Sequence, residues 1–400
     1  MSNPPVSVRA AASLAAALFL SLLAREAGAR QDAPAPPLSP PEKAPALARD
    51  PDAELKSALL PILTTTRTPA VAVAVFDAQK LLAKAAAGVR ARGAPDTVTT
   101  ADRWHIGSVS KSFTATLIGL LVQDGKLAWD TTLEKALPEA APRMHADFRG
   151  VTIEDLLRHR AGIAAFTDGR SPDFEMLKGL NGSTNERRAA FVAKLLSLEP
   201  TIKPGVKQVY SNAGYAVAAA IAEAATGSDY ESLMNERVFA PLAITHAGFG
   251  WPATPARRDE PRGHMPGLLG ATAQAFDPQY KLDPVMAPAG DIHCPIEELA
   301  AFARMHLRAL QEEPGTPAPL LKPDTAKALH SPIDGYAAGW VIDTKSTPER
   351  HWHNGSAGTF YTLMVIVPER GIGAVAVSNS GEGEKACVDA VEAALEMVPR

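Results

Sequence analysis

A serine and a lysine in the first third of the chain have the types and spacing needed for acyl transfer. Ser108 and Lys111 lie three positions apart, and Lys111 is the only charged residue between positions 106 and 123. On a helix, residues three apart are neighbours on one face. If the lysine is buried, the loss of water lowers its pKa, and its neutral amine can take the proton of the serine hydroxyl. Backbone N–H groups in the first turn of a helix are free to bind an oxyanion.

The sequence around this pair predicts a helix, from Gly107 onward, that is packed against other parts of the protein. Small residues share the face of the serine and lysine, and a large apolar stripe lies on roughly the opposite face. A surface helix would carry several charges on one of these faces. The Ser-x-x-Lys pattern alone is common by chance, so the uncharged surroundings are what support a catalytic pair. The small residues are Ser112, Ala115 and Gly119, and the stripe is Val109, Phe113, Leu117, Leu120 and Leu121.

A second pattern, Tyr210-Ser211-Asn212, stands directly before an alanine-rich stretch. That stretch, residues 212–225, predicts a helix that stops at Gly227. Asn212 has two interpretations, because an asparagine at this place can cap the helix or bind a ligand. Tyr210 also has two, as a core aromatic residue or as part of a functional site.

A third pattern, His353-Asn354-Gly355-Ser356, precedes a predicted strand. Its glycine would let another backbone or a ligand approach closely. His351 and His353 alternate onto one face of an extended chain, which would suit a metal hydrolase. The sequence has no His-Glu-x-x-His pattern and no evident third ligand, so we predict neither a metal site nor a cofactor. The absence of a Gly-x-Ser-x-Gly pattern disfavours an α/β-hydrolase.

The three patterns, in this order, resemble the three motifs of the penicillin-recognising serine hydrolases. That family includes class C β-lactamases, DD-peptidases and related esterases. The related class A enzymes carry a Ser-x-x-Lys, a Ser-Asp-Asn and a Lys-Thr-Gly motif, and which group acts as their acylation base is disputed. Segments 106–115, 204–215 and 288–291 also look like family segments, and the resemblance extends from about residue 55 to the C-terminus.

The resemblance implies a role for each motif residue. Ser108 would attack a carbonyl carbon and form an acyl-enzyme, which water would then hydrolyse. Lys111 and Tyr210 would share the proton transfer, with either as the formal base. Asn212 would hydrogen-bond a substrate amide. The backbone N–H groups of Ser108 and Ser356 would form the oxyanion hole, next to Gly355.

His353 departs from the lysine that β-lactamases usually carry in the third motif, whereas related DD-peptidases and esterases have histidine there. Efficient β-lactam hydrolysis is therefore not expected. The resemblance implies that His353 faces Tyr210 and a substrate carboxylate. Because histidine titrates near ~6.5, a cationic His353 predicts that affinity for acidic substrates falls between about pH 6 and 8.

The elements that must position these residues form an α+β pattern. The fold that the resemblance implies is β-lactamase/transpeptidase-like, with an antiparallel sheet of both chain ends flanked by helices and a mostly helical inserted domain. Residues 52–104 and 292–400 would form the sheet domain, and residues 105–291 the helical domain. Within the helical domain, residues 250–290 are rich in loops. We predict strands at 70–76, 81–89, 339–343, 359–367 and 372–378, and helices at 153–158, 187–197, 212–225, 297–310 and 384–397.

The first 51 residues predict a leader and a tether. Residues 1–29 read as a signal peptide, with Arg9 before an apolar run too short to span a membrane and Ala27-Gly28-Ala29 at the cleavage site. The alternative is an uncleaved anchor helix. Residues 30–51 are a proline-rich linker. We expect an exported protein, periplasmic or secreted, with no stable membrane span after cleavage. Export would permit a disulfide between Cys294 and Cys387, whose proximity the sequence does not show.

The composition is typical of a soluble protein and gives no sign of a nucleic-acid partner. The 400 residues are 46% hydrophobic and 21% charged with a net charge of −4, as in a soluble globular protein without a nucleic-acid footprint. The sequence therefore predicts an exported serine hydrolase for a small-molecule or peptide substrate, an amide or ester. It would be DD-peptidase- or esterase-like more than an efficient β-lactamase. The alternative is a catalytically silent envelope protein that binds peptidoglycan-like ligands in the same groove. The sequence predicts no oligomeric state.

Overall fold

The computed structural model describes residues 50–399, except 168–171, 268–269, 279–280 and 313–318. The predicted signal peptide and residues 30–49 of the predicted linker lie outside the described residues. Pro51, which we assigned to the linker, is instead the first residue of helix α2 (Pro51–Thr66), since the Asp50 carboxylate accepts the N–H groups of Asp52 and Ala53 and caps this helix. Within the described ranges, no helix is long and apolar enough to cross a membrane.

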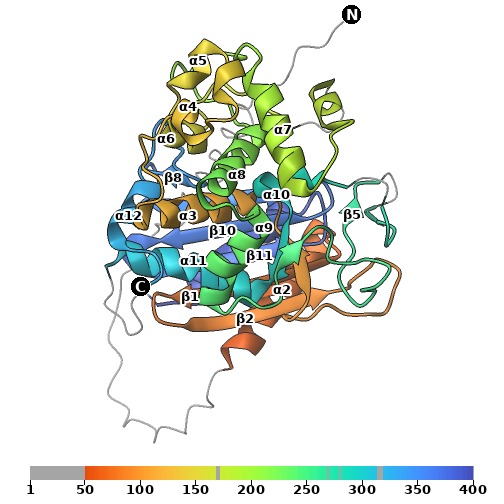
Figure 1. The fold of residues 1–400 in the computed structure, drawn as a ribbon. Helices are drawn as coiled ribbons and strands as arrows, with labels where there is room; N and C mark the ends of the chain where they lie inside the picture. The colour runs from red at the N-terminus through yellow and green to blue at the C-terminus, as the bar shows by residue number, and fades with distance from the viewer. Residues whose placement is uncertain (1–49, 168–171, 268–269, 279–280, 313–318, 400) are drawn as a thin grey trace, which may run out of the picture. The chain divides into compact units, whose positions relative to one another are not determined.

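One antiparallel sheet of six strands joins the two ends of the described chain (Figure 1). Its order is β2-β1-β11-β10-β9-β8, so the N-terminal pair β2-β1 joins four strands from the C-terminal part through the pairing of β1 with β11. The predicted α+β fold with a sheet of both chain ends is confirmed. The strands are β1 (Ala70–Asp77), β2 (Leu81–Gly88), β8 (Val341–Asp343), β9 (Arg350–Ser356), β10 (Tyr361–Val367) and β11 (Ile372–Ser378).

Side-chain alternation along β1 gives the sheet two covered faces. Its valines at 71, 73 and 75 pack with α2 and with α13 (Glu384–Glu396) in one core cluster. The alanines at 70, 72 and 74 belong to a second cluster on the other face, together with α11 (Ile296–Leu310). Successive residues of a strand point to opposite faces, so the alternating Ala-Val sequence produces this arrangement directly.

A series of helices and short turns lies between two small strands, β3 (Arg103–His105) and β7 (Ile292–Pro295). The division into a sheet domain and a helical domain at residues 105–291 stays a prediction. In this region lie η1 (Gly107–Val109), α3 (Ser110–Gln123), α4 (Leu133–Ala136), η2 (Ala141–Arg143), α5 (Ala146–Arg149), α6 (Ile153–Leu157), η3 (Pro172–Leu177), α7 (Thr184–Leu196), α8 (Asn212–Thr226), α9 (Tyr230–Met234), η4 (Asn235–Phe239), η5 (Ala240–Leu242), β4 (Gly248–Phe249), β5 (His264–Met265), β6 (Thr272–Ala273), η6 (Pro284–Met286) and α10 (Ala287–Gly290). After β7 and α11 come α12 (Pro323–Leu329) and, between β10 and β11, η7 (Pro368–Arg370).

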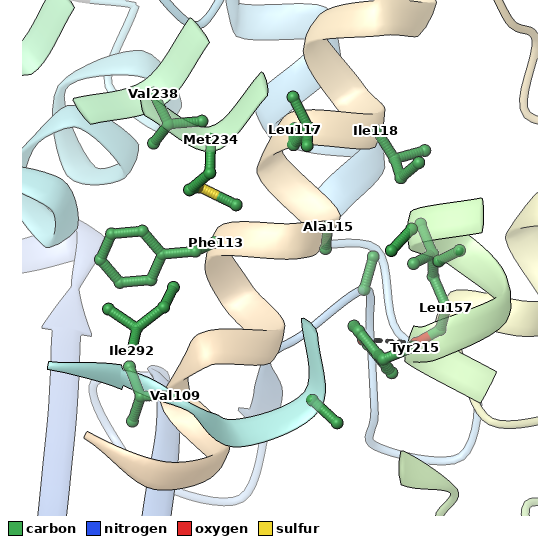
Figure 2. Packing of buried hydrophobic residues seen from close by; sticks show 14 of the residues in the cluster. Val109, Phe113, Ala115, Leu117, Ile118, Leu157, Tyr215, Met234, Val238 and Ile292 are labelled. Carbon is green, nitrogen blue, oxygen red and sulfur yellow. Dashed lines mark hydrogen bonds between the residues drawn. The ribbon is translucent and has the colours of Figure 1, made fainter. Parts of the chain in front are cut away.

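Helix α3 is buried on all sides, as its uncharged sequence predicted. Every residue from Ser110 to Leu121 is buried. Figure 2 shows Phe113 on the side of Met234 and Ile292, while Ala115 faces the side of Tyr215. The Phe113 ring also stacks on Phe302 of α11 with their centroids 3.6 Å apart. This close packing fixes the position of the helix that carries Lys111.

Most predicted elements lie where the sequence placed them, and the differences have local causes. Helix α7 begins three residues earlier than predicted, because Ser183 and Glu186 form a capping box in which the Ser183 N–H donates to the Glu186 carboxylate at 2.8 Å. Residues 350–356, which we did not predict as a strand, form β9. Strand β8 begins at Val341, two residues late, because the Gly339 backbone packs against Ser112 of α3 and accepts its hydroxyl hydrogen at 2.6 Å.

The two cysteines are free and buried. Cys294 belongs to the core cluster that contains α3 and α11, whereas Cys387 belongs to the cluster with α2. The sheet therefore separates the two thiols, and the disulfide that the sequence left open is not formed.

Candidate active site

Ser108 lies in η1, directly before α3, and its side chain is half-buried. The residue before it, Gly107, has a φ of +52° and donates its N–H to His105 Nδ1 at 3.2 Å. Because Nδ1 accepts that hydrogen, the other ring nitrogen, Nε2, carries the proton of His105 and donates to Asp291 Oδ1 at 3.1 Å. The Ser110 hydroxyl donates to Gly107 O at 2.7 Å. The turn that carries the serine is thus held from both sides.

Lys111 is completely buried, and its Nζ lies 3.1 Å from Ser108 Oγ. Nζ also donates a hydrogen bond to Ala289 O at 2.7 Å. Burial holds the pKa of Lys111 well below its usual value, and in the part of the chain that the structure describes no carboxylate pairs with it. A lysine in these surroundings can be a neutral amine, which is able to accept the serine proton.

Tyr210 stands at the same serine. Lys111 Nζ lies 4.7 Å from the centroid of the Tyr210 ring. Burial raises the pKa of Tyr210 above its usual value, and the influence of the Ser108 side chain opposes this shift. The phenol is therefore protonated near neutral pH. The structure brings Ser108, Lys111 and Tyr210 together. Of the two candidate bases, Lys111 has a pKa shifted toward pH 7, whereas the pKa of Tyr210 is shifted away from it.

Asn212 does not cap its helix. The N-cap of α8 is Ser211, whose Oγ accepts the Gly214 N–H at 2.9 Å, so the capping interpretation of Asn212 is wrong. The Asn212 side-chain amide instead donates from Nδ2 to Phe166 O at 2.8 Å. Its Oδ1 atom is buried and has no hydrogen-bond partner among the described residues. This oriented and unpartnered oxygen can accept an N–H from a ligand.

Gly355 and Gly107 let strand β9 approach the serine turn. A Cβ atom on Gly355 would lie 2.0 Å from Ile106 O and 2.8 Å from Ser108 N. A Cβ atom on Gly107 would lie 2.6 Å from Ser356 N. Strand β8 pairs with residues 350–352 of β9 and not with the end of the strand at Ser356, which is exposed. The backbone N–H groups of Ser108 and Ser356 therefore lie in one contact region, beside the serine side chain.

His353 is buried and differs from what we expected. Its Nδ1–H donates to Asn354 O at 2.6 Å, so Nε2 accepts the Tyr336 hydroxyl hydrogen at 3.0 Å. Burial, and secondarily the charge of Lys111, lowers the pKa of His353 to about 3. The ring is neutral near pH 7 and both nitrogens have protein partners. The predicted fall in affinity for acidic substrates between about pH 6 and 8 assumed a cationic His353, and this assumption is wrong because burial keeps the ring neutral in that range.

His351 belongs to a different set of contacts. Its Nδ1 lies 3.0 Å from His330 Nδ1, and its Nε2 lies 2.8 Å from a Glu349 oxygen. His330 in turn contacts His306 at 3.0 Å. These rings form a chain rather than converging on one point. Within the described ranges, no group of three or more histidine, cysteine or acidic side chains is arranged to hold a metal ion.

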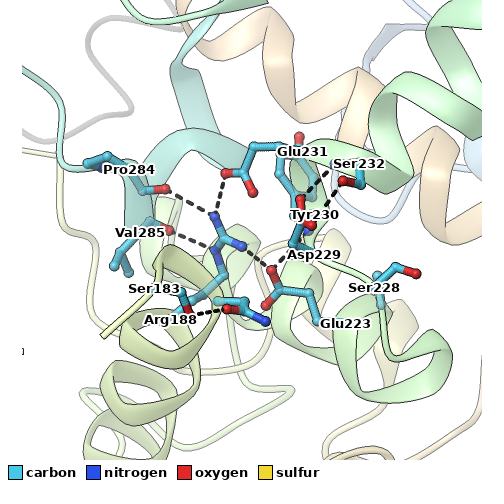
Figure 3. Close-up of polar contacts among 12 residues, drawn as sticks. Ser183, Arg188, Glu223, Ser228, Asp229, Tyr230, Glu231, Ser232, Pro284 and Val285 are labelled. Atoms are coloured by element: carbon cyan, nitrogen blue, oxygen red, sulfur yellow. Dashed lines mark hydrogen bonds and ion pairs between the residues drawn. The ribbon is translucent and has the colours of Figure 1, made fainter. Parts of the chain in front are cut away.

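Sequence reasoning missed a buried ion cluster around Arg188, which Figure 3 shows. The cluster holds the turn that leads to Ala289, whose oxygen accepts a hydrogen from the Lys111 amine. Arg188 of α7 is fully buried and pairs with Glu223 and, at 2.9 Å, with Glu231. The same guanidinium donates to the backbone oxygens of Pro284 at 3.1 Å and Val285 at 3.4 Å. These carbonyls belong to η6, which leads directly into α10 and its Ala289 oxygen. Arg187 and Arg188 are adjacent in sequence, and only the packing of α7 distinguishes the buried one.

Sequence reasoning also missed His159 and Tyr336. The first stands in a basic run, Arg158-His159-Arg160, which in a sequence is typical of a solvated loop. Both residues are buried, with ring centroids 4.8 Å apart. The His159 ring also lies 4.4 Å from the Tyr210 ring. No local sequence signal distinguishes these residues, because their contacts come from distant segments.

The family model described as Beta-lactamase matches residues 47–397. This chain belongs to the beta-lactamase family. It is 29% identical over 330 residues to penicillin-binding protein 4 of Amycolatopsis lactamdurans, covering 80% of this chain and 82% of that protein. The family resemblance inferred from the three motifs is confirmed.

Solved structures support the beta-lactamase-family fold. The crystal structure of SurE superposes with a TM-score of 0.70 and 24% identity, covering 86% of this chain and 76% of that one. A D-stereospecific amidohydrolase from a Streptomyces species superposes with a TM-score of 0.64 and 21% identity, covering 85% of this chain and 98% of that one. At these identities the likeness concerns the fold. As a member of the beta-lactamase family, this chain is related to serine hydrolases and penicillin-binding proteins.

Proposed function

We propose that this protein is a serine hydrolase that transfers the acyl group of a peptide, amide or ester to Ser108 and then to water. The observation that carries the proposal is the Lys111 amine, which is fully buried, has a lowered pKa and lies 3.1 Å from Ser108 Oγ. Burying an amine without a carboxylate partner is costly for stability. That cost is understandable where the amine serves as a base.

In the proposed acylation, Ser108 Oγ bonds to the substrate carbonyl carbon while its proton moves to Lys111 Nζ. The carbonyl oxygen becomes an oxyanion, which the N–H groups of Ser108 and Ser356 stabilise. The bond to the leaving group then breaks, and the departing nitrogen or oxygen takes a proton from the Tyr210 hydroxyl, which is replaced by the proton held on Lys111. In deacylation, water attacks the acyl carbon and its proton passes through Tyr210 to Lys111. The ester bond to Ser108 Oγ then breaks, and Oγ takes the proton back from Lys111. Lys111 acts as the base because its pKa is lowered, whereas the pKa of Tyr210 is raised.

Two side chains define the substrate that suits this site. The unpartnered Asn212 Oδ1 would accept an N–H group of an amide-bearing substrate. His353 is neutral, and both ring nitrogens have partners, so it offers no positive charge to a substrate carboxylate. These features support an esterase- or peptidase-like enzyme more than an efficient β-lactamase. A relative is named penicillin-binding protein 4, which makes benzylpenicillin a suitable probe.

We also propose that the protein is exported, either to a periplasm or outside the cell. The support is the signal-like sequence of residues 1–29, with its small-residue pattern ending at Ala29. Mass spectrometry of the protein purified from its native host should find a mature chain beginning at Arg30. A mature chain that still begins at Met1 would contradict cleavage.

The test of the proposed function is the intact mass after exposure to an activated ester and, separately, to benzylpenicillin. We expect the wild type to be acylated by the ester and to release product, and Ser108→Ala to do neither. Ser57→Ala, which removes an exposed hydroxyl on α2, is the matched control and should behave like the wild type. Equal labelling of Ser108→Ala would refute the nucleophile. Ligand binding without any acylation of the wild type would favour the silent binding protein.

A further inference from the structure

His159 is bound to both neighbours of Tyr210. Its backbone oxygen accepts the Val209 N–H at 2.8 Å, and its ring Nδ1 accepts the Ser211 N–H at 3.1 Å. The ring itself lies against the Tyr210 ring at a centroid distance of 4.4 Å. One residue therefore fixes the main chain on each side of the tyrosine and packs against its side chain.

The loop that begins at His159 also hydrogen-bonds with the residues that follow Tyr210. Ala164 O accepts the Ser211 hydroxyl hydrogen at 2.6 Å, and Ala165 O accepts the Asn212 N–H at 2.8 Å. Phe166 O then orients the Asn212 side chain. Residues 159–166 thus form a cradle for residues 209–212, and His159 is the member of this cradle that uses a side chain.

The conformation and protonation of His159 are both constrained. Its φ is +60°, in the left-handed region, where histidine, asparagine and aspartate are the non-glycine residues found most often. Because Nδ1 accepts the Ser211 hydrogen, the neutral ring carries its proton on Nε2. That Nε2 atom is buried and has no hydrogen-bond partner among the residues the structure describes. An unpaired buried N–H opposes folding, so stability alone does not account for this histidine.

The surroundings keep the ring neutral. Lys111 and His353 are the basic groups that act on it, and the rings of Tyr210, Tyr215 and Tyr336 surround it at 4.4–5.3 Å. Burial, with smaller contributions from Lys111 and His353, holds the pKa of His159 well below its usual value. A protonated ring would have no lone pair for the Ser211 N–H, and the support of Tyr210 would be lost.

We propose that His159 is a positioning residue for acyl transfer, whose Nδ1 acceptor holds Tyr210 at Ser108 and Asn212 at the substrate. This inference rests on the proposed function, since it concerns the same reaction. It assigns to His159 no contact with substrate. Its effect is exerted through the main chain of residues 209–211.

Three substitutions test the acceptor. His159→Asn keeps an oxygen at the same number of bonds from Cα as Nδ1, and asparagine tolerates a positive φ. His159→Gln moves the oxygen one bond further out, and His159→Leu removes the acceptor. We expect the Leu and Gln variants to lose roughly 100-fold in the rate constant of Ser108 acylation by an activated ester, because a displacement of ~1 Å costs about that factor. KM should change by less than about threefold, and His159→Asn should recover most of the rate.

A control and an independent measurement separate positioning from folding. His306→Leu removes another buried histidine that contacts Thr116 at 2.9 Å, away from the Tyr210 motif, and should lower the melting temperature without lowering kcat. Nitrogen NMR of the wild type, assigned with the Asn variant, should show His159 with its proton on Nε2. Acylation of the Gln and Leu variants at the wild-type rate, an Asn variant as slow as Leu at equal stability, or a proton on Nδ1 would each overturn the inference. A wild type that no ester acylates would instead count against the proposed function.

Discussion

Replacing Gly355 with alanine should separate strand β9 from the turn that carries Ser108. The added Cβ would lie 2.0 Å from Ile106 O, where ordinary contact begins near 3.4 Å, so the two backbones must move apart by about 1.4 Å. The obstructing atoms belong to the backbone, and no rotamer change can relieve the overlap. Ser108 N lies 2.8 Å from the same position, so the displacement falls on the proposed oxyanion hole.

The magnitude follows from this displacement. Loss of one oxyanion donor costs about 10²–10³-fold in kcat, and a misplacement of ~1 Å costs about 10²-fold. We therefore expect kcat for an activated ester to fall by roughly 10²–10³-fold. Overpacking costs about 1–3 kcal/mol, so the free energy of unfolding should fall only by that amount and the fold should remain.

The assay compares Gly355→Ala with Gly150→Ala in single-turnover acylation and in urea denaturation. Gly150 has a φ of −86°, and a Cβ at that position would meet nothing within 4 Å, so alanine there should leave both quantities unchanged. Wild-type kcat in Gly355→Ala would show that β9 does not support the oxyanion. Loss of activity together with global unfolding would show that the glycine serves the fold rather than the reaction.

Three further predictions concern the base, the ion cluster and acid stability. Lys111→Met should lower the acylation rate by about 10²–10⁴-fold with Ser108 intact, and an unchanged rate would exclude Lys111 as the base. Arg188→Met should cost about 3–5 kcal/mol in urea denaturation, because two carboxylates lose their buried partner. Arg187→Met, which removes a partly exposed pair, should cost about 1 kcal/mol or less. Burial lowers the pKa values of His293 and His306 to about 3, so the unfolded chain binds protons that the native state refuses. The free energy of unfolding is therefore undiminished above about pH 6.5 and falls as the pH drops toward 3, by about 2 kcal/mol per histidine at pH 5. Equal urea midpoints at pH 7.5 and pH 5 would contradict this.

Local patterns predicted most elements of the fold because those elements depend on nearby residues. The Ala-Val alternation of β1 and the apolar sequence of α3 correspond to surfaces that are buried in the structure. The sequence did not reveal β9, since Arg350–Ser356 contains polar and charged residues and is held as a strand by its pairing with β10. It also did not predict α2, whose apolar residues Leu55 and Leu59 are buried only against the sheet.

By itself, the sequence determined the order of three motifs and, through them, the family. It also determined that Ser108 and Lys111 share a helical face, because a spacing of three residues is a property of the backbone. Only the tertiary structure decided the protonation states. Whether His353 is a solvated cation or a buried neutral ring depends on Tyr336 and Lys111, which approach it from other elements. The same holds for His159, whose place at Tyr210 arises because a loop after α6 packs beneath the start of α8. Charge and hydrogen bonding at these sites depend on desolvation and on distant partners, and neither is encoded in the residues next to them.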